Sequence, residues 1–427
     1  MPDSLSAWLA HLEAGHPQGA AGITLGLSRV AAVAAHLGVL QAVPVITVAG
    51  TNGKGSTCAM LECILGSAGY RVGLYTSPHL LDYNERVRIG GMAASDAVLC
   101  TAFASVEAAR QAAGGVNLSY FEFGTLAAWQ CFGAERVDAV ILEVGLGGRL
   151  DAVNCFDADC AIVTSIDLDH TEYLGDTREA IGFEKAGVFR AGRPAICGDR
   201  EPPQSLVAHA LAIGADLQVL GRDFGYLRQE SQWQYRSRAG KKSGLAYPAL
   251  HGVHQLHNAS SALAALEALA ARLPVAMQDI RRGLSEVELP GRFQVLPGRP
   301  TIVLDVAHNP QAARALSDNI GNMAFHPETW AVFGMLRDKD IRAVVSAIKD
   351  RITRWLPCSL PGPRGAEAAE VAQMLREMGI TESLPQFDGP AAAFRHARGT
   401  ANESDRILVF GSFLTVADVL RELARKA

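Results

Sequence analysis

The chain has 427 residues, more than one hydrophobic core usually organises, so we expect two domains. The formal net charge of −5 excludes the basic field that attracts nucleic acids or anionic membranes. The eight cysteines form no CxxC pair, so we expect mostly buried, reduced thiols in a cytoplasmic protein. We also expect no signal peptide and no membrane span.

Apolar periodicity predicts an alternation of helices and strands along the first part of the chain. Helical spacing appears over about 5–12 and 27–37, and again from Ser56 to about Ser67. Continuous apolar runs, typical of strands in a buried parallel sheet, occupy 43–48, 72–75, 139–144 and 161–166. A polar, broken stretch at 221–250 predicts a meander or small antiparallel excursion, and an alanine-rich helix follows at 258–272.

Pro290-Gly291 is a natural break in the pattern. Beyond it, predicted strands at 301–306, 330–333, 353–356 and 407–410 alternate with helices. This β-α-β alternation is typical of a doubly wound fold. We therefore expect a second, smaller α/β domain after the break.

A glycine-rich loop, Ala49-Gly50-Thr51-Asn52-Gly53-Lys54-Gly55-Ser56-Thr57, joins the first predicted strand to a helix. Backbone N–H groups at such a helix N-terminus favour phosphate oxygens. Lys54 adds a positive charge, and Ser56 or Thr57 offers a hydroxyl to Mg²⁺. Position 48 is Val where the standard P-loop has its first glycine, so the loop is a shortened variant.

Polar side chains also follow the next predicted strands. Ser77 follows the second strand, Glu143 ends the third, and Asp169-His170 follow the fourth. The carboxyl ends of parallel strands share one edge of the sheet, which is where ligands bind in such folds. Hard oxygen donors suit Mg²⁺, whereas His170 is a less usual ligand for this ion. The sequence thus predicts a nucleotide and magnesium site at this edge.

Each of these residues also has an ordinary structural explanation. A lone glycine loop is often a tight turn, Ser77 precedes a proline, Glu143 has Arg149 as a candidate ion-pair partner, and His170 can be a hydrogen-bonded structural histidine. Their occurrence together at one end of one sheet favours the functional interpretation.

Lys185 lies in a small, apolar segment, Gly182-Phe183-Glu184-Lys185-Ala186-Gly187. The ordinary structural interpretation is that Lys185 is a surface lysine on a helix or an ion-pair partner of Glu184. The apolar surroundings instead favour a lysine inside a site, where it binds phosphate or is carbamylated. Composition does not choose between these.

Together, these residues resemble the Mur ligase superfamily, most closely its folate branch, the bacterial dihydrofolate synthases/folylpolyglutamate synthases. Besides the glycine loop and the residues above, the matching motifs run in family order across nearly the whole chain: Thr76-Ser77-Pro78-His79-Leu80, Asn84-Glu85-Arg86-Val87-Arg88, Phe121-Glu122-Phe123-Gly124-Thr125, 143–151, Asp169-His170-Thr171, His257-Asn258-Ala259, Pro290-Gly291-Arg292-Phe293-Gln294 and Leu304-Asp305-Val306-Ala307-His308-Asn309-Pro310. The resemblance implies an α/β fold with a Mur-ligase-like P-loop domain over 1–289, carrying a mostly parallel sheet, and a smaller Rossmann-like glutamate ligase domain over 290–427.

The resemblance also implies roles for individual residues. The ATP site would comprise Gly53, Lys54, Gly55, Ser56, Asn258, Arg292 and Asp305. Magnesium would be held by Ser77, Glu143 and His170. The catalytic residues would be Lys54, His170 and Lys185, the last carbamylated. The pterin substrate would lie along Ile23, Thr24, Leu25, Gly26, Phe121, Glu122, Phe123, Gly124, Leu150, Asp151 and Ala152, and the incoming glutamate would face His308 and Ser412.

The pterin segments show one departure from the family and one feature that has two explanations. The closest family members have Asp where this chain has Thr24. Aromatic rings at Phe121 and Phe123 offer faces on which a pterin stacks, and Gly124 permits close backbone approach. The alternative is that both rings belong to the core beneath a helix start.

The implied activity is an ATP-dependent amide ligase of folate biosynthesis and one-carbon metabolism. ATP would phosphorylate a carboxylate, and the glutamate amine would displace phosphate, on dihydropteroate or on tetrahydrofolate polyglutamates. Mg²⁺, Lys54 and backbone N–H groups would neutralise charge, with K⁺ or another monovalent cation as an additional cofactor. Substrates are small molecules, and the family resemblance implies a monomer.

Two alternative functions remain. A peptidoglycan Mur ligase would act on a UDP-sugar, but the Phe121–Gly124 segment is present and the N-terminus is short for a dedicated UDP-binding domain. A P-loop switch protein would use nucleotide hydrolysis for regulation, but Val48 breaks the usual loop and no Asn-Lys-x-Asp sequence occurs. The balance between the two folate activities is not readable from the sequence.

Overall fold

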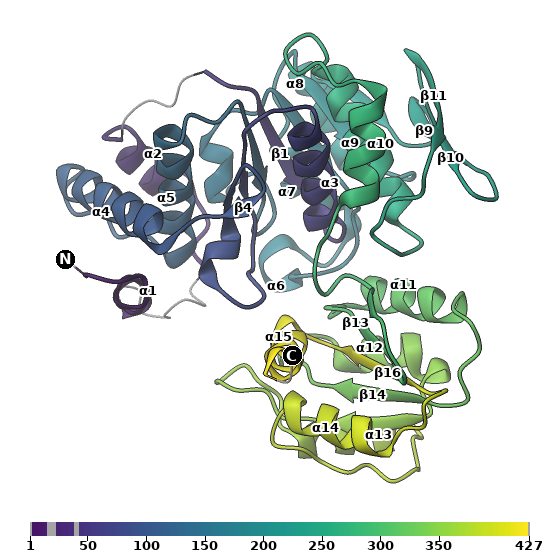
Figure 1. Cartoon of the computed structure of the whole chain (residues 1–427). Coiled ribbons are helices and arrows are strands. Elements are labelled where there is room, and N and C mark those ends of the chain that lie inside the picture. Colours follow the sequence, from purple (N-terminus) through teal and green to yellow (C-terminus); the bar gives the residue numbers. More distant parts are fainter. Residues whose placement is uncertain (1, 15–22, 38–41, 426–427) are drawn as a thin grey trace. The chain divides into compact units, whose positions relative to one another are not determined.

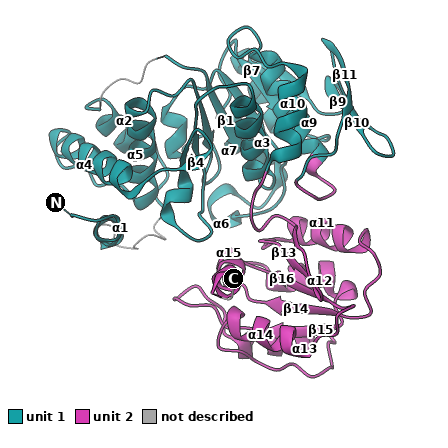
Figure 2. Ribbon diagram, viewed as in Figure 1, with its two compact units in different colours: residues 1–249, 256–287 teal, residues 250–255, 288–427 magenta. Residues whose placement is uncertain are grey.

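The computed structural model describes residues 2–14, 23–37 and 42–425. The chain divides into two compact units, residues 1–249 with 256–287 and residues 250–255 with 288–427 (Figure 2). The chain therefore leaves the first unit after residue 249, returns at 256, and leaves again after 287.

An eight-stranded sheet forms the centre of the first unit, in the order β4-β3-β2-β5-β1-β6-β7-β8. Its strands are β1 (Val45–Ala49), β2 (Val72–Tyr75), β3 (Val87–Ile89), β4 (Met92–Ala93), β5 (Ala139–Glu143), β6 (Cys160–Val163), β7 (Pro194–Cys197) and β8 (Asp216–Val219). From β2 to β8 every neighbouring pair is parallel, while β3 and β4 extend one edge in antiparallel pairing. All residues of β1 and β5 are buried, as their continuous apolar runs predict.

Helices lie on both faces of this sheet (Figure 1). They are α1 (Leu5–Ala14), α2 (Ser28–Ala34), α3 (Lys54–Ser67), α4 (Asp96–Ala112), α5 (Tyr120–Ala134), α6 (Thr171–Leu174), α7 (Arg178–Ala186), α8 (Gln204–Ile213), α9 (Gln255–Ala268) and α10 (Met277–Glu286), with short 3₁₀ turns η2 (Tyr83–Arg86) and η3 (Ala152–Cys155). Ser119 begins α5 with a reciprocal capping box to Glu122. The core on one side of the sheet is rich in aromatic side chains from α1, α4 and α5.

The polar stretch after β8 forms a separate three-stranded antiparallel sheet, which confirms the predicted excursion. Its strands are β9 (Phe224–Arg228), β10 (Trp233–Ser237) and β11 (Gly240–Leu245). The β10 side chains of Trp233 and Tyr235 are fully buried.

The second unit is built on a five-stranded sheet in the order β12-β13-β16-β14-β15. Its elements are β12 (Gln294–Leu296), β13 (Thr301–Leu304), α11 (Pro310–Gly321), β14 (Thr329–Phe333), α12 (Ile341–Ile348), η4 (Lys349–Arg351), β15 (Arg354–Pro357), α13 (Ala368–Glu377), α14 (Pro390–Thr400), β16 (Arg406–Phe410) and α15 (Phe413–Ala424). Only the edge strand β12 is antiparallel to its neighbour. Phe333, Trp355 and Phe410 pack together in its core.

The predicted strands are confirmed, but those predicted at 161–166 and 301–306 end earlier, at Val163 and Leu304. The apolar run at 161–166 predicts a strand to Ile166, but β6 ends at Val163 because the following residues hold the glycine loop. Five of the eight cysteines are buried and all are free thiols, as expected. Among the described residues, no helix is both long and apolar enough to cross a membrane.

Candidate active site

The glycine loop connects β1 to α3 with backbone conformations that need glycine. Gly53 precedes α3 at φ +89°, and a Cβ there would lie 2.5 Å from Oδ1 of Asn258. The α9 residue Asn258, predicted to serve the ATP site, therefore packs directly on the loop. Lys54 folds back over it, and its Nζ donates hydrogen bonds to the carbonyl oxygens of Gly50 (2.9 Å) and Thr51 (3.1 Å). Lys54 is thus held by weak backbone acceptors that a phosphate can replace.

The segment after β6 fastens this loop through hydroxyl groups that sequence reasoning missed. The Thr164 hydroxyl donates to the carbonyl oxygen of Asn52 at 2.7 Å, and the Ser165 hydroxyl donates to the same oxygen at 3.0 Å. In return, the Asn52 N–H donates to Ser165 Oγ at 3.1 Å. Two consecutive hydroxyl residues at the end of a buried strand are the signal that was available.

The structure brings Ser77 and Glu143 together at the carboxyl ends of the neighbouring strands β2 and β5. The Ser77 N–H donates to Glu143 Oε2 at 3.2 Å, and Glu143 is only 5% exposed. Arg149, the alternative partner considered for Glu143, instead forms an ion pair with Glu184 at 2.8 Å. A buried carboxylate beside a serine supplies the oxygen donors that suit Mg²⁺.

His170 lies at the start of α6 in the left-handed region, with φ +51°. Its Nε2 is 3.9 Å from Oδ1 of Asp169. Within the described ranges, no three His, Cys, Asp or Glu side chains cluster as a ready-made metal cage. A Mg²⁺ ion at this edge would accordingly complete its coordination with water and phosphate oxygens, as it does in many nucleotide enzymes.

Lys185 is buried, with 4% of its surface exposed, so the surface interpretation is wrong. Its pKa is lowered to about 7, mainly by burial and also by the positive charge of Lys54, whereas Asp169 and Asp151 act in the opposite direction. These electrostatic partners place Lys185 beside the glycine loop. A lysine with such a pKa is largely available as a neutral amine near pH 7.

The three segments predicted to bind a pterin converge in the first unit. The Gly26 N–H donates to the carbonyl oxygen of Leu150 at 3.1 Å. Arg29 forms an ion pair with Glu122 at 2.7 Å and donates to the carbonyl oxygen of Thr24 at 3.0 Å. The segments 23–26, 121–124 and 150–152 are therefore joined by hydrogen bonds.

Asp151, in the last of these segments, stabilises the local backbone. It accepts hydrogen bonds from the N–H groups of Leu146 (2.8 Å) and Val153 (3.1 Å), so it holds the turn that follows β5. Burial raises its pKa to about 7, although these backbone hydrogen bonds work against the rise.

The two phenylalanines differ in their surroundings. Phe123 is 2% exposed and packs against both Trp8 and Phe103, so the core alternative describes its side chain. Phe121 is only partly buried and lies against Tyr75, with ring centroids 5.8 Å apart. Gly124 permits the close approach of a protein group, because a Cβ there would lie 2.6 Å from the Tyr83 hydroxyl.

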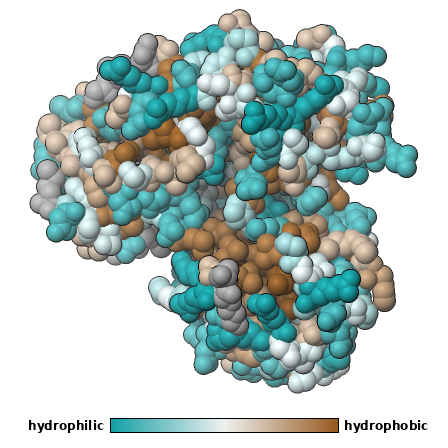
Figure 3. Space-filling view, viewed as in Figure 1, coloured by the Kyte–Doolittle hydropathy of each residue, from teal (hydrophilic) through white to brown (hydrophobic). Residues whose placement is uncertain are grey.

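The second unit gathers its predicted residues at the carboxyl ends of β13 and β16. Burial raises the pKa of Asp305 to about 6, while hydrogen bonds and the charge of Arg292 oppose the rise. The Arg292 guanidinium lies 4.8 Å from the centre of the Phe413 ring, and the His308 ring is 6.1 Å from the same ring. Ser412 caps α15 and is 4% exposed. Figure 3 shows apolar side chains gathered on this unit in the area where Figure 1 draws α15.

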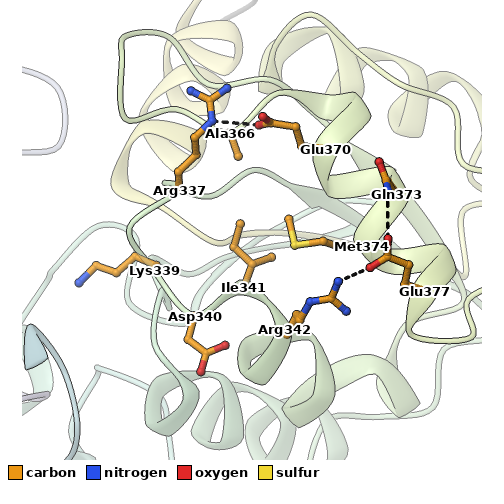
Figure 4. A pocket seen from close by; sticks show the side chains of 10 residues that line it. All are labelled: Arg337, Lys339, Asp340, Ile341, Arg342, Ala366, Glu370, Gln373, Met374 and Glu377. Carbon is orange, nitrogen blue, oxygen red and sulfur yellow. Dashed lines mark hydrogen bonds and ion pairs between the residues drawn. The ribbon is translucent and has the colours of Figure 1, made fainter. Parts of the chain in front are cut away.

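A surface cavity of about 520 Å³ in the second unit contains none of the predicted residues (Figure 4). Four of its charged side chains form two ion pairs, Arg337 with Glu370 at 3.0 Å and Arg342 with Glu377. These pairs are solvent-exposed and contribute little to stability. We assign no site to this cavity.

Comparison with known proteins matches both units to one family. Residues 48–266 match the Mur ligase middle domain and residues 291–413 the Mur ligase glutamate ligase domain. The dihydrofolate synthase/folylpolyglutamate synthase of Escherichia coli is 46% identical over 97% of this chain and 94% of its own length. The Haemophilus influenzae protein of the same name is 40% identical over 97% of this chain and 96% of its own.

The chain belongs to the dihydrofolate synthase/folylpolyglutamate synthase family of Mur ligases. Among solved structures, Escherichia coli FolC in complex with DHPP and ADP has a TM-score of 0.93 and 44% identity, and the match covers 100% of both chains. The bifunctional enzyme of Yersinia pestis has a TM-score of 0.90 and 45% identity over 99% of this chain and 100% of that one. The predicted family, fold class and enzyme class, a ligase that forms carbon–nitrogen bonds, are therefore confirmed.

Proposed function

We propose that this ligase joins L-glutamate to dihydropteroate, forming dihydrofolate, and extends tetrahydrofolate with further glutamates, at the expense of ATP. The names of its relatives support this activity, and one related structure holds Mn, AMPPNP and L-glutamate. The observation that carries the proposal is the meeting of the glycine loop, the Ser77–Glu143 pair and buried Lys185 at one edge of a parallel sheet.

The first chemical step transfers the γ-phosphoryl group of ATP to the substrate carboxylate. Lys54 and the N–H groups at the start of α3 neutralise the approaching negative charges. Ser77, Glu143 and His170 would hold Mg²⁺, which supplies charge neutralisation at the phosphates when bound. Lys185, as a carbamate, would present a further negative group on the metal side, and K⁺ or another monovalent cation would assist.

The second step is attack by the glutamate amine on the acyl phosphate, with release of phosphate. We assign the glutamate to His308 and Ser412, and the remaining ATP contacts to Asn258, Arg292 and Asp305. In this assignment, residues 1–289 bind ATP and the pterin, and residues 290–427 form the glutamate ligase domain. Water must be kept from the acyl phosphate, because it hydrolyses.

Glu143→Gln tests the magnesium assignment. The amide keeps the size of the carboxylate and can still accept the Ser77 hydrogen bond, but it lacks the charge that attracts Mg²⁺. We expect the Mg²⁺ concentration for half-maximal rate to rise at least about tenfold, with the melting temperature unchanged in the absence of nucleotide. Glu107→Gln, at a half-buried glutamate of α4 that pairs with Arg110, is the control that should keep the wild-type Mg²⁺ requirement. If Glu143→Gln instead unfolds at a lower temperature but keeps a normal Mg²⁺ requirement, Glu143 is a structural residue and not a magnesium ligand.

Phe121→Leu tests the pterin assignment, and Phe123→Leu is its matched control. Phe121 is partly exposed, so we expect loss of its ring to raise the KM for dihydropteroate about tenfold and to leave the KM for ATP within about twofold. Phe123 lies in the core, so its substitution should lower the melting temperature by a few degrees and change neither KM. Equal effects of Phe121→Leu on both substrates would remove the segment from the pterin site.

Substrate-dependent ATP hydrolysis separates this function from its alternatives. We expect turnover with dihydropteroate and glutamate together, and none with a UDP-muramoyl substrate or with ATP alone. Hydrolysis stimulated only by the UDP-muramoyl substrate would contradict the proposal.

We further propose that the enzyme is monomeric and cytoplasmic. Light scattering of the purified protein at working concentration tests whether it is a monomer.

A further inference from the structure

Arg86, at the end of η2, has surroundings unlike those of the other arginines near the site. Its guanidinium lies over two aromatic rings, 5.3 Å from the centre of Tyr83 and 5.6 Å from that of Tyr120. Its Nε donates a hydrogen bond to Nδ1 of His79 at 2.9 Å. Burial raises the pKa of Tyr75, and the charge of Arg86 offsets part of that rise, which places Arg86 beside this hydroxyl as well.

These contacts leave the charge of Arg86 without a counter-ion. In the described part of the chain, no Asp or Glu forms an ion pair with it, whereas Arg29, Arg71 and Arg88 on nearby elements each bind a glutamate. Glu85, its neighbour in sequence, accepts the N–H groups of Leu80, Leu81 and Asp82 instead. A guanidinium carries five N–H donors, more than His79 and Tyr75 use.

A partly buried cation without an anion is costly unless a ligand supplies the anion. The aromatic contacts hold the guanidinium in a fixed plane, and such a plane binds a carboxylate through two parallel hydrogen bonds. The side chain is therefore already oriented for a carboxylate before any ligand arrives.

The location of Arg86 identifies which carboxylate this is. Its carbonyl oxygen accepts the N–H of Thr76 at 2.9 Å, one residue from Ser77 in the proposed magnesium site. On its other side, Tyr120 begins α5 directly before Phe121 in the proposed pterin segment. Arg86 thus lies between the groups assigned to the pterin ring and those assigned to the metal and phosphate.

We propose that Arg86 binds a carboxylate of the acceptor substrate, the benzoate carboxylate in the case of dihydropteroate, and so aligns the reacting end of that substrate with the γ-phosphate. This assignment rests on the proposed function. Arg86 then binds the substrate carboxylate that ATP phosphorylates, and it is distinct from the residues that hold ATP or glutamate. His79, which accepts from Arg86 through Nδ1, helps to fix the guanidinium plane.

The test compares two ligands on two proteins by isothermal titration calorimetry without ATP. The ligands are dihydropteroate and the same dihydropterin carrying an unsubstituted aniline, which lacks only the carboxylate. We expect the wild-type protein to prefer dihydropteroate at least about tenfold, as a charge-assisted bidentate pair would give. Arg86→Gln should reduce that preference about tenfold while changing the affinity for the aniline compound less than threefold.

Two further variants complete the design. Arg86→Lys keeps the charge but not the two-pronged geometry, so its preference should fall between those of the wild type and Arg86→Gln; it also replaces Arg86→Gln in the comparison if that variant does not fold. Arg71→Gln, at the opposite end of β2 and exposed, should keep the wild-type preference.

The outcomes are distinguishable. A selective loss of affinity for dihydropteroate in the Arg86 variants supports the assignment. If these variants lose affinity for both ligands equally, Arg86 is a structural residue and the assignment is overturned, while the proposed function stands. If the wild-type protein binds neither ligand, the proposed function is wrong and the role of Arg86 falls with it.

Discussion

Replacing Lys54 with alanine is expected to lower kcat/KM for ATP about 100- to 1,000-fold, the effect of removing one group that stabilises charge in a transition state. The melting temperature without ligands should change little, because the Lys54 ammonium donates its hydrogen bonds to two carbonyl oxygens of its own loop. Steady-state kinetics with varied ATP, alongside thermal unfolding, measures both quantities.

Lys241→Ala is the matched control for Lys54. Lys241 is an exposed lysine in β11 of the same unit, and its loss should leave the kinetics unchanged. If Lys54→Ala retained activity within a few-fold of the wild type, the glycine loop would not be the phosphate site.

Lys185→Ala is expected to be inactive and to recover partial activity with small carboxylates such as acetate. The buried position leaves a space the size of the lost side chain, and a carboxylate there would replace the negative group of a carbamate. With ¹³C-labelled bicarbonate, NMR should show a carbamate resonance in the wild-type protein that Lys185→Ala lacks. A phosphate-binding lysine would give neither the resonance nor the rescue.

The pH dependence of this carbamate follows from the pKa of Lys185. A carbamate forms from CO₂ and the neutral amine, and burial lowers the pKa of Lys185 to about 7. The amine is therefore mostly neutral above about pH 7 and protonated below it. The intensity of the carbamate resonance at constant dissolved CO₂ should fall as the pH is lowered through 7. An intensity unchanged between pH 6 and pH 8 would contradict a carbamate on this lysine.

The sheet and its functional edge were predictable because two simple patterns coincide. Continuous apolar runs mark the strands β1, β2 and β5, and the chemistry-bearing residues stand directly after them. Since parallel strands end at one edge, the meeting of Ser77 and Glu143 follows from their positions alone. The burial of Lys185 was one of the alternatives that its apolar surroundings left open.

Other features were not predictable because they depend on contacts between distant segments. Strand β6 ends before Thr164 and Ser165, whose hydroxyl groups bind the glycine loop; the two hydroxyl residues are a local signal, but their partner Asn52 lies more than a hundred positions earlier in the sequence. Gly124 makes room for the hydroxyl of Tyr83, 41 positions earlier in the sequence. The different environments of Phe121 and Phe123 follow from which face of α5 meets Trp8, and this is set by tertiary packing.

Positional isotope transfer tests the central claim, activation of a substrate carboxylate by ATP, most directly. Dihydropteroate labelled with ¹⁸O in both carboxylate oxygens is incubated with the enzyme, ATP, Mg²⁺ and L-glutamate, and the released phosphate is analysed by mass spectrometry. An acyl phosphate requires that one carboxylate oxygen leaves with the phosphate, so we predict one ¹⁸O atom per phosphate and one retained in dihydrofolate. Unlabelled phosphate accompanied by dihydrofolate formation, or phosphate release without dihydrofolate, would contradict the account.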